Sequence, residues 1–190
     1  MSLHADALAT LDSWPAPTAE QAALRERYLA HLRAHADGLD RACRPDHLTA
    51  SALVVSPDAE RVLLTLHAKA GRWFQFGGHC EPGDATLAGA ALREATEEFG
   101  LAQLDLDPVP LQLSEHAVPF CGPSTAADRP VHHLDVRFLA VARDGAEHTV
   151  SEESLDVRWW PIDRLPEPDP DLVELASWAR ARLAPRAVSR

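Results

Sequence analysis

Residues 77–101 read GGHCEPGDATLAGAALREATEEFGL, and this stretch decides the fold. Its second half predicts a helix from about Thr86 to Phe99, on which three glutamates stand at positions i, i+3 and i+4 and share one face. They are Glu94, Glu97 and Glu98. Carboxylates so placed repel one another unless a cation lies among them, and oxygen ligands of this kind suit Mg²⁺ or Mn²⁺. The alternative is an acidic helix face that contacts only water.

Glycines before this helix favour the ligand interpretation. Gly77 and Gly78 let the backbone approach a ligand or metal closely, and Pro82-Gly83 forms a turn that leads into the helix. On these residues the chain resembles the Nudix hydrolase family, whose box reads G-x5-E-x7-R-E-U-x-E-E-x-G-U, where U is aliphatic. The second half of the box matches at every fixed position between Arg93 and Leu101.

The first half of the box departs from the family pattern. Counting on from Gly78, the glutamate position holds Asp84, and eight residues instead of seven then precede Arg93. Counting back from Arg93 places Ala85 there instead. Either Asp84 serves across a one-residue insertion, or this carboxylate is absent. In the family this glutamate mainly supports the loop and its arginine, so the departure concerns loop geometry more than metal binding.

The resemblance implies an α/β fold, a Nudix-type α/β/α sandwich with a mixed sheet, and a Mg²⁺-dependent hydrolase. The reaction implied is cleavage of the pyrophosphate bond of a nucleoside diphosphate linked to another moiety. The implied metal ligands, for Mg²⁺ or Mn²⁺, are Glu94, Glu97, Glu98 and the Gly78 carbonyl. Arg93 would orient the glutamates through charge-assisted hydrogen bonds. The proton acceptor would be one of these glutamates or an acid on a distant loop, for which we favour Glu153.

Substrate contacts are expected from residues beside the box. The candidates are Arg72, Gly77, Gly78 and His79. Glycine backbone allows close approach, and cationic side chains form charge-assisted hydrogen bonds with phosphate. For Arg72 the alternative is an exposed cation without a role. For the aromatic residues of 73–76, packing in the core competes with stacking on a base.

Other polar residues give weaker signals. The strand expected at 131–141 alternates, and its polar face carries His133, Asp135 and Arg137. That face either lines a substrate cleft or forms a hydrogen-bonded set within the fold. The ten histidines show no ligand spacing typical of zinc, so the sequence does not predict a zinc site. Cys80 lies in the box loop without a visible activating partner, and we interpret it as a packing residue.

Composition limits the partners. The 18 basic and 29 acidic residues leave a formal charge of −11, which argues against a nucleic-acid surface built from a general basic field. No apolar run reaches the roughly 18 residues that span a bilayer, and the first residues lack the pattern of a signal peptide. Three widely spaced cysteines indicate no disulfide framework, so we expect a cytoplasmic protein. The partner that the family resemblance implies is a small molecule.

The chain divides into an N-terminal helical extension, 1–45, and a hydrolase domain, 46–190, closed by a C-terminal helix. Thr18 and Gln21 fit a capping box, and Gly38 fits a helix stop. Asp169 and Pro170 are typical of the start of the closing helix. The apolar stripe of the extension needs a surface to cover, which is provided either by its own domain or by a homodimer.

Two alternatives to hydrolysis remain at this stage. One is a non-catalytic Nudix-like module that senses a nucleotide, which the loss of box glutamates would indicate. The other is an isopentenyl-diphosphate isomerase, which has the same fold and places a reactive cysteine two residues before a histidine. Here Gly77 stands two residues before His79, so that match fails.

Overall fold

The computed structural model describes residues 1–68, 70–99, 104–118, 121, 130–143, 154–166 and 169–184, and for 98, 99 and 154 only the backbone. The helices are α1 (Leu3–Ser13), α2 (Ala19–Ala34), α3 (Leu87–Phe99) and α4 (Pro170–Leu183). The strands are β1 (Asp46–Val55), β2 (Arg61–His67), β3 (Trp73–Phe74), β4 (Phe76–His79), β5 (Leu104–Ala117), β6 (His132–Ala142) and β7 (Ser154–Pro161).

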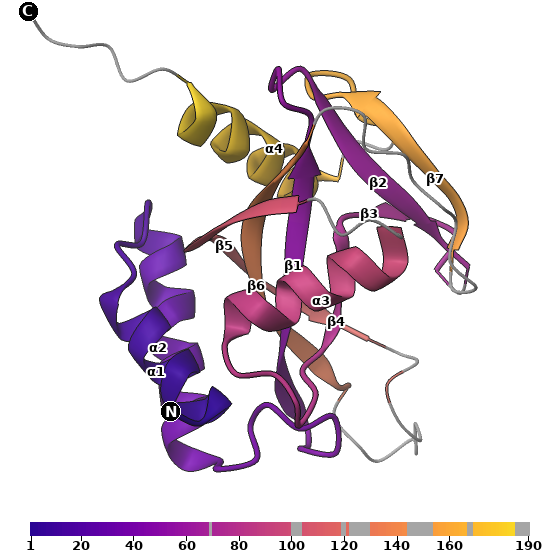
Figure 1. Ribbon diagram of the computed structural model, residues 1–190. Helices are drawn as coiled ribbons and strands as arrows, with labels where there is room; N and C mark the ends of the chain where they lie inside the picture. Colours follow the sequence, from indigo (N-terminus) through magenta and orange to yellow (C-terminus); the bar gives the residue numbers. More distant parts are fainter. Residues whose placement is uncertain are drawn as a thin grey trace, which may run out of the picture.

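The seven described strands form one mixed sheet. Its order is β3-β2-β1-β6-β5, with β4 also paired to β1 and β7 to β2. The β1 and β6 strands run parallel, and the other pairs are antiparallel. Every residue of β1 is buried, as expected for a central strand covered on both faces. The predicted α/β/α sandwich with a mixed sheet and N-terminal helices is confirmed (Figure 1).

The two faces of the sheet bury different helices, because successive residues of a strand point to opposite sides. Leu48 and Ala52 of β1 belong to the apolar core shared with α1, α2 and α3. Leu53 and Val55 belong to a second core, shared with α4. On the α4 side the central strands also carry polar residues, so the box helix α3 and this polar region lie on opposite faces.

The N-terminal helices pack on the sheet of their own domain. Ala7, Leu11 and Tyr28 are fully buried in the main core. The indole Nε1 of Trp14 donates to the carbonyl of Pro110 at 2.6 Å. Because the domain covers the apolar stripe itself, the stripe gives no reason to expect a homodimer, which stays an untested prediction.

Two local expectations for α2 need correction. Thr18 caps the helix as predicted, accepting from the backbone N–H of Gln21. The side chain of Gln21 does not return the bond, because both its amide groups pair with the backbone of Leu113 on β5. The helix also ends at Ala34 instead of near Gly38, whose carbonyl accepts from the backbone N–H of Leu48 on β1 at 2.8 Å.

Candidate active site

The box helix α3 packs against β4. A Cβ atom at Gly78 would stand 2.7 Å from the nearer carboxylate oxygen of Glu94, so only glycine leaves room for this side chain. The preceding glycine, Gly77, lets β4 pack closely on β1. A Cβ at Gly77 would lie 2.2 Å from the Cβ of Ser51 on β1. Both positions therefore need glycine. A carboxylate approaches the backbone at Gly78, and the neighbouring strand β1 approaches it at Gly77.

Arg93 connects the carboxylates of the site. Its Nη1 donates to Glu94 at 3.0 Å and to Glu97 at 3.1 Å. Its Nη2 donates to the backbone carbonyl of His79 at 3.0 Å. The guanidinium thus holds two of the predicted metal ligands next to β4, which is the orienting contact that the sequence led us to expect.

Asp84 pairs with the Arg93 guanidinium. Nε and Nη2 of Arg93 donate to its two carboxylate oxygens, each at 3.0 Å. The side chain also accepts from the N–H of Glu81 at 2.8 Å. Burial alone would raise the pKa of Asp84, but these bonds lower it below its ordinary value. Of the two alternatives drawn from the sequence, the structure has the carboxylate present, across a one-residue insertion.

Burial shapes the electrostatics of Glu94. It raises the pKa of this carboxyl, while the Arg93 guanidinium opposes the shift and the neighbouring Glu97 adds to it. The side chain of Glu97 is 60% exposed, so this carboxylate faces solvent. A half-buried and an exposed carboxylate on one helix face have unused oxygen lone pairs, which is the donor chemistry that a hard divalent cation requires.

Of the other predicted site residues, Glu98 and Glu153 cannot be placed by their side chains, while His79 and Arg72 contact residues outside the carboxylate group. The side chain of Glu98 and all of Glu153 lie outside the described residues, so both assignments stay predictions. The ring of His79 is turned toward Cys121, with Nε2 at 3.3 Å from Sγ. Arg72 forms an ion pair with Asp169 at 2.9 Å, beside the start of α4.

Asp135 and Arg137, on the polar face of β6, form a hydrogen-bonded set. Asp135 is 3% exposed and accepts from Thr49, Ser51 and the Arg137 guanidinium. Arg137 in turn forms an ion pair with Asp171 of α4 at 2.7 Å. Burial would raise the pKa of Asp135, but the Arg137 charge and the hydrogen bonds lower it. This satisfied network favours the structural interpretation of the face over a substrate cleft.

One group was missed by sequence reasoning. His47, His79, His133 and Cys121 each offer one ligand atom, and these atoms all lie within 4.8 Å of one another. The residues are far apart in the chain, so no motif spacing could indicate them. Cys80, in contrast, packs against the main core, and burial raises the pKa of its thiol to about 12, as expected for an unreactive cysteine.

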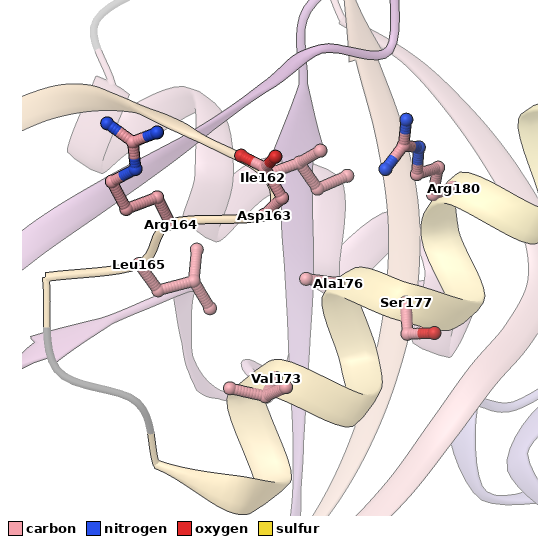
Figure 2. A pocket seen from close by; sticks show the side chains of 8 residues that line it. All are labelled: Ile162, Asp163, Arg164, Leu165, Val173, Ala176, Ser177 and Arg180. Carbon is pink, nitrogen blue, oxygen red and sulfur yellow. The ribbon is translucent and has the colours of Figure 1, made fainter.

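A separate hollow lies between the turn after β7 and helix α4 (Figure 2). Leu165, Val173 and Ala176 form its apolar part, and Arg164 and Arg180 stand on opposite sides of it. None of its lining residues belongs to the carboxylate group around Arg93. The hollow therefore does not contribute to the candidate active site.

Helix α3 carries the sequence Arg-Glu-x-x-Glu-Glu and packs against β4, the strand that contains Gly77 and Gly78, at one face of a mixed sheet. This combination defines the Nudix class of fold and site. The NUDIX domain profile matches residues 45–181, and the chain belongs to this family. The prediction of an enzyme of the Nudix pyrophosphohydrolase class is thereby confirmed. No helix of the described residues combines the length and apolar character needed to cross a membrane.

Solved structures share the fold. A Nudix-family hydrolase from Clostridium perfringens is 22% identical, with a TM-score of 0.54 over 72% of this chain and 97% of that one. A C. elegans Ap4A hydrolase is 19% identical, with a TM-score of 0.55 over 72% and 97%. A MutT NUDIX hydrolase from Burkholderia pseudomallei is 26% identical, with a TM-score of 0.52 over 68% and 95%. A comparison with curated protein sequences found no match.

Proposed function

We propose that this chain hydrolyses the pyrophosphate bond of a nucleoside diphosphate linked to another moiety, with Mg²⁺, or Mn²⁺, as the metal ion. The observation that carries the proposal is the Glu94 carboxylate held under Gly78, with Glu97 tied to the same arginine. The ion would be held by Glu94, Glu97, Glu98 and the Gly78 carbonyl.

The described residues fit such an ion. The space that a Cβ at position 78 would fill is taken by carboxylate oxygens of Glu94. Only oxygen donors are offered there, and oxygen is the ligand type that Mg²⁺ prefers. When bound, Mg²⁺ neutralises charge on phosphate oxygens and makes a bound water a better nucleophile.

The protein side chains orient and balance charge. Arg93 offsets the negative charge of Glu94 and Glu97 and ties both to a guanidinium that also donates to the His79 carbonyl at the end of β4. Asp84 fixes the guanidinium by a two-point contact, which sets its orientation as well as its distance. We assign the proton acceptor to Glu153, and the phosphate contacts to the backbone of residues 77–79 and to Arg72.

The substrate class is supported by what similar folds bind. The C. elegans protein is an Ap4A hydrolase, and a dihydroneopterin triphosphate pyrophosphohydrolase of E. coli has the same fold. The NUDIX domain of Shewanella oneidensis NrtR was solved with ADP ribose. These compounds share a phosphate anhydride attached to a larger organic group. We infer a small-molecule substrate of that class, with neither nucleic acid nor membrane as partner.

We also propose a cytoplasmic location. Cys43, Cys80 and Cys121 are free thiols, and free cysteines are typical of a reducing compartment.

The experiment is a substrate panel with the wild type and Glu97→Gln. The panel contains ADP-ribose, NADH, dinucleoside polyphosphates, CoA, sugar nucleotides and damaged nucleotides, with and without Mg²⁺ or Mn²⁺. We expect turnover of at least one compound, dependent on the cation, and its loss in Glu97→Gln without a change in the unfolding midpoint.

The matched control is Glu26→Gln. The side chain of Glu26 is 61% exposed and is bonded to Arg25, so it resembles Glu97 in exposure and partner but lies on α2. Activity retained in Glu97→Gln would show that the assigned cluster is wrong. Tight nucleotide binding without turnover across the panel would support the sensing module instead.

A further inference from the structure

Three histidines and a cysteine converge on the face of the sheet opposite the box helix. His47 is on β1, His79 ends β4, His133 is on β6, and Cys121 follows β5. The ring centroids of the three histidines lie 4.9 to 5.1 Å apart in every pairing. A compact set of nitrogen and sulfur donors thus comes from four separate parts of the chain.

The two distances from the Cys121 thiol match those of a tetrahedral metal site. Sγ of Cys121 lies 3.3 Å from Nε2 of His79 and 3.6 Å from Nε2 of His47. Zn–N bonds of about 2.0–2.1 Å and a Zn–S bond of about 2.3 Å place tetrahedral ligands about 3.3–3.6 Å from one another. Both distances from Sγ are therefore of the length that a tetrahedral zinc site requires, and all four ligand atoms lie within 4.8 Å of one another.

The hydrogen-bond inventory points to a ligand as well. A thiol carries one proton, so it can donate to His47 or to His79 but not to both. Nε2 of His133 is buried and has no hydrogen-bond partner. A buried orphan nitrogen is costly, and a cation at the centre would give every one of these atoms a partner.

The surroundings orient the ligands. Nδ1 of His47 lies 3.2 Å from the backbone carbonyl of Cys43 and donates to it, which leaves Nε2 free to bind a metal. Burial, and then the neighbouring His47, lowers the pKa of His79 to about 4. Burial, and then His79, lowers that of His133 to about 3.

We propose that His47, His79, His133 and Cys121 form a structural Zn²⁺ site, separate from the Mg²⁺ site of the box helix. Three imidazoles and a thiolate suit zinc, whereas Mg²⁺ prefers oxygen. Four protein ligands complete the tetrahedron and leave no open position, which is typical of a structural ion. The ion cross-links β1, β4, β6 and Cys121, which lies four residues after the end of β5.

His79 connects the two sites. Its ring is a ligand of the proposed zinc, while its backbone carbonyl accepts from Nη2 of Arg93 at 3.0 Å. Zinc would thus hold the end of β4 against which Arg93 is oriented. We expect zinc removal to loosen this segment, although zinc itself takes no part in the chemistry.

The test is the metal content of the chain prepared without a histidine tag. We expect about one zinc per wild-type chain after desalting, and near-complete loss in Cys121→Ser and in His133→Gln. The controls are Cys80→Ser, beside His79 in sequence, and His116→Gln, whose ring centroid lies 5.6 Å from that of His133. Both controls and Glu97→Gln should keep their zinc.

Cobalt substitution of the wild type keeps the test valid if a variant does not fold. The proposed site predicts the visible absorption of tetrahedral Co²⁺ together with a thiolate-to-cobalt charge-transfer band. Zinc should raise the melting temperature of the chelator-treated chain. Absence of zinc and of the cobalt band in the wild type, or zinc retained at full level in Cys121→Ser and His133→Gln, would overturn the proposal.

Discussion

Asp84 illustrates how one residue decides the geometry of the site. The box loop is one residue longer than the family pattern, and its acid is one methylene shorter than glutamate. The carboxylate nevertheless reaches Nε and Nη2 of Arg93, both at 3.0 Å. The longer backbone brings the shorter side chain to the arginine, and the site keeps a bidentate acid–arginine pair.

Asp84→Ala should therefore lower kcat/KM by about 10–100-fold, the range typical of residues that orient metal ligands. Asp84→Glu should also be less active than the wild type, because the one-residue insertion already supplies the reach that glutamate would add. The measurement is steady-state kinetics on the best panel substrate. Asp105→Ala, which removes an exposed partner of Arg143, is the control and should leave the kinetics unchanged.

The two glycines of the box loop make a paired prediction. Gly77→Ala forces a Cβ against the Ser51 side chain and backbone, so we expect a loss of about 1–3 kcal/mol in the free energy of unfolding. Gly78→Ala meets only the end of the Glu94 side chain, which moves instead. It should reduce activity more than stability. Urea unfolding and kinetics separate the two, and equal loss of stability would contradict this assignment.

At the scale of elements, helix α1 supports the box helix. The Asp6 carboxylate accepts from the backbone N–H of Leu87 at 2.9 Å, across 81 positions of sequence. The first N–H groups of a helix lack partners within the helix, and an acidic group there also meets the positive end of the helix dipole. A residue of the N-terminal extension thus caps the helix that carries the carboxylates.

Asp6→Ala should cost about 0.5–2 kcal/mol in the free energy of unfolding, as does the loss of other caps. Asp12→Ala is the control within the same helix, since its side chain is 73% exposed and lies 3.6 Å from Arg33. We expect almost no change for the control in urea unfolding. A similar effect of both variants would mean that the long-range cap has no energetic role.

At the scale of the whole molecule, the N-terminal helices are part of the hydrophobic core. Leu11 is fully buried in the cluster that also contains Leu87 and Ala91 of the box helix. Core residues of one cluster share packing, so α1 and α2 contribute to the stability of the hydrolase fold itself.

Leu11→Ala should consequently cost about 2–5 kcal/mol, the range for a buried leucine. Val173→Ala, at a side chain on α4 that is 44% exposed, should cost far less. Both are measured by thermal and urea unfolding. A small effect of Leu11→Ala would instead indicate an extension that folds apart from the sheet.

Much of the fold follows from local patterns. The Thr18 cap, the strand expected at 131–141 and the start of α4 at Asp169-Pro170 depend on neighbouring residues, and the structure places them within one or two residues of expectation. The docking of Gln21 on Leu113 and the full length of β5 depend on pairing between distant segments. Local sequence patterns do not predict such pairings between distant segments.

The sequence by itself determined the family, the glutamate-bearing helix and the arginine beside it, because these residues lie within one turn or two of a helix whose periodicity is fixed. Only the tertiary structure decided that Asp84 pairs with Arg93. It alone also brought together His47, His79, His133 and Cys121. The physical reason is that strand pairing joins residues by register across the sheet, and register depends on contacts that no spacing along the chain records.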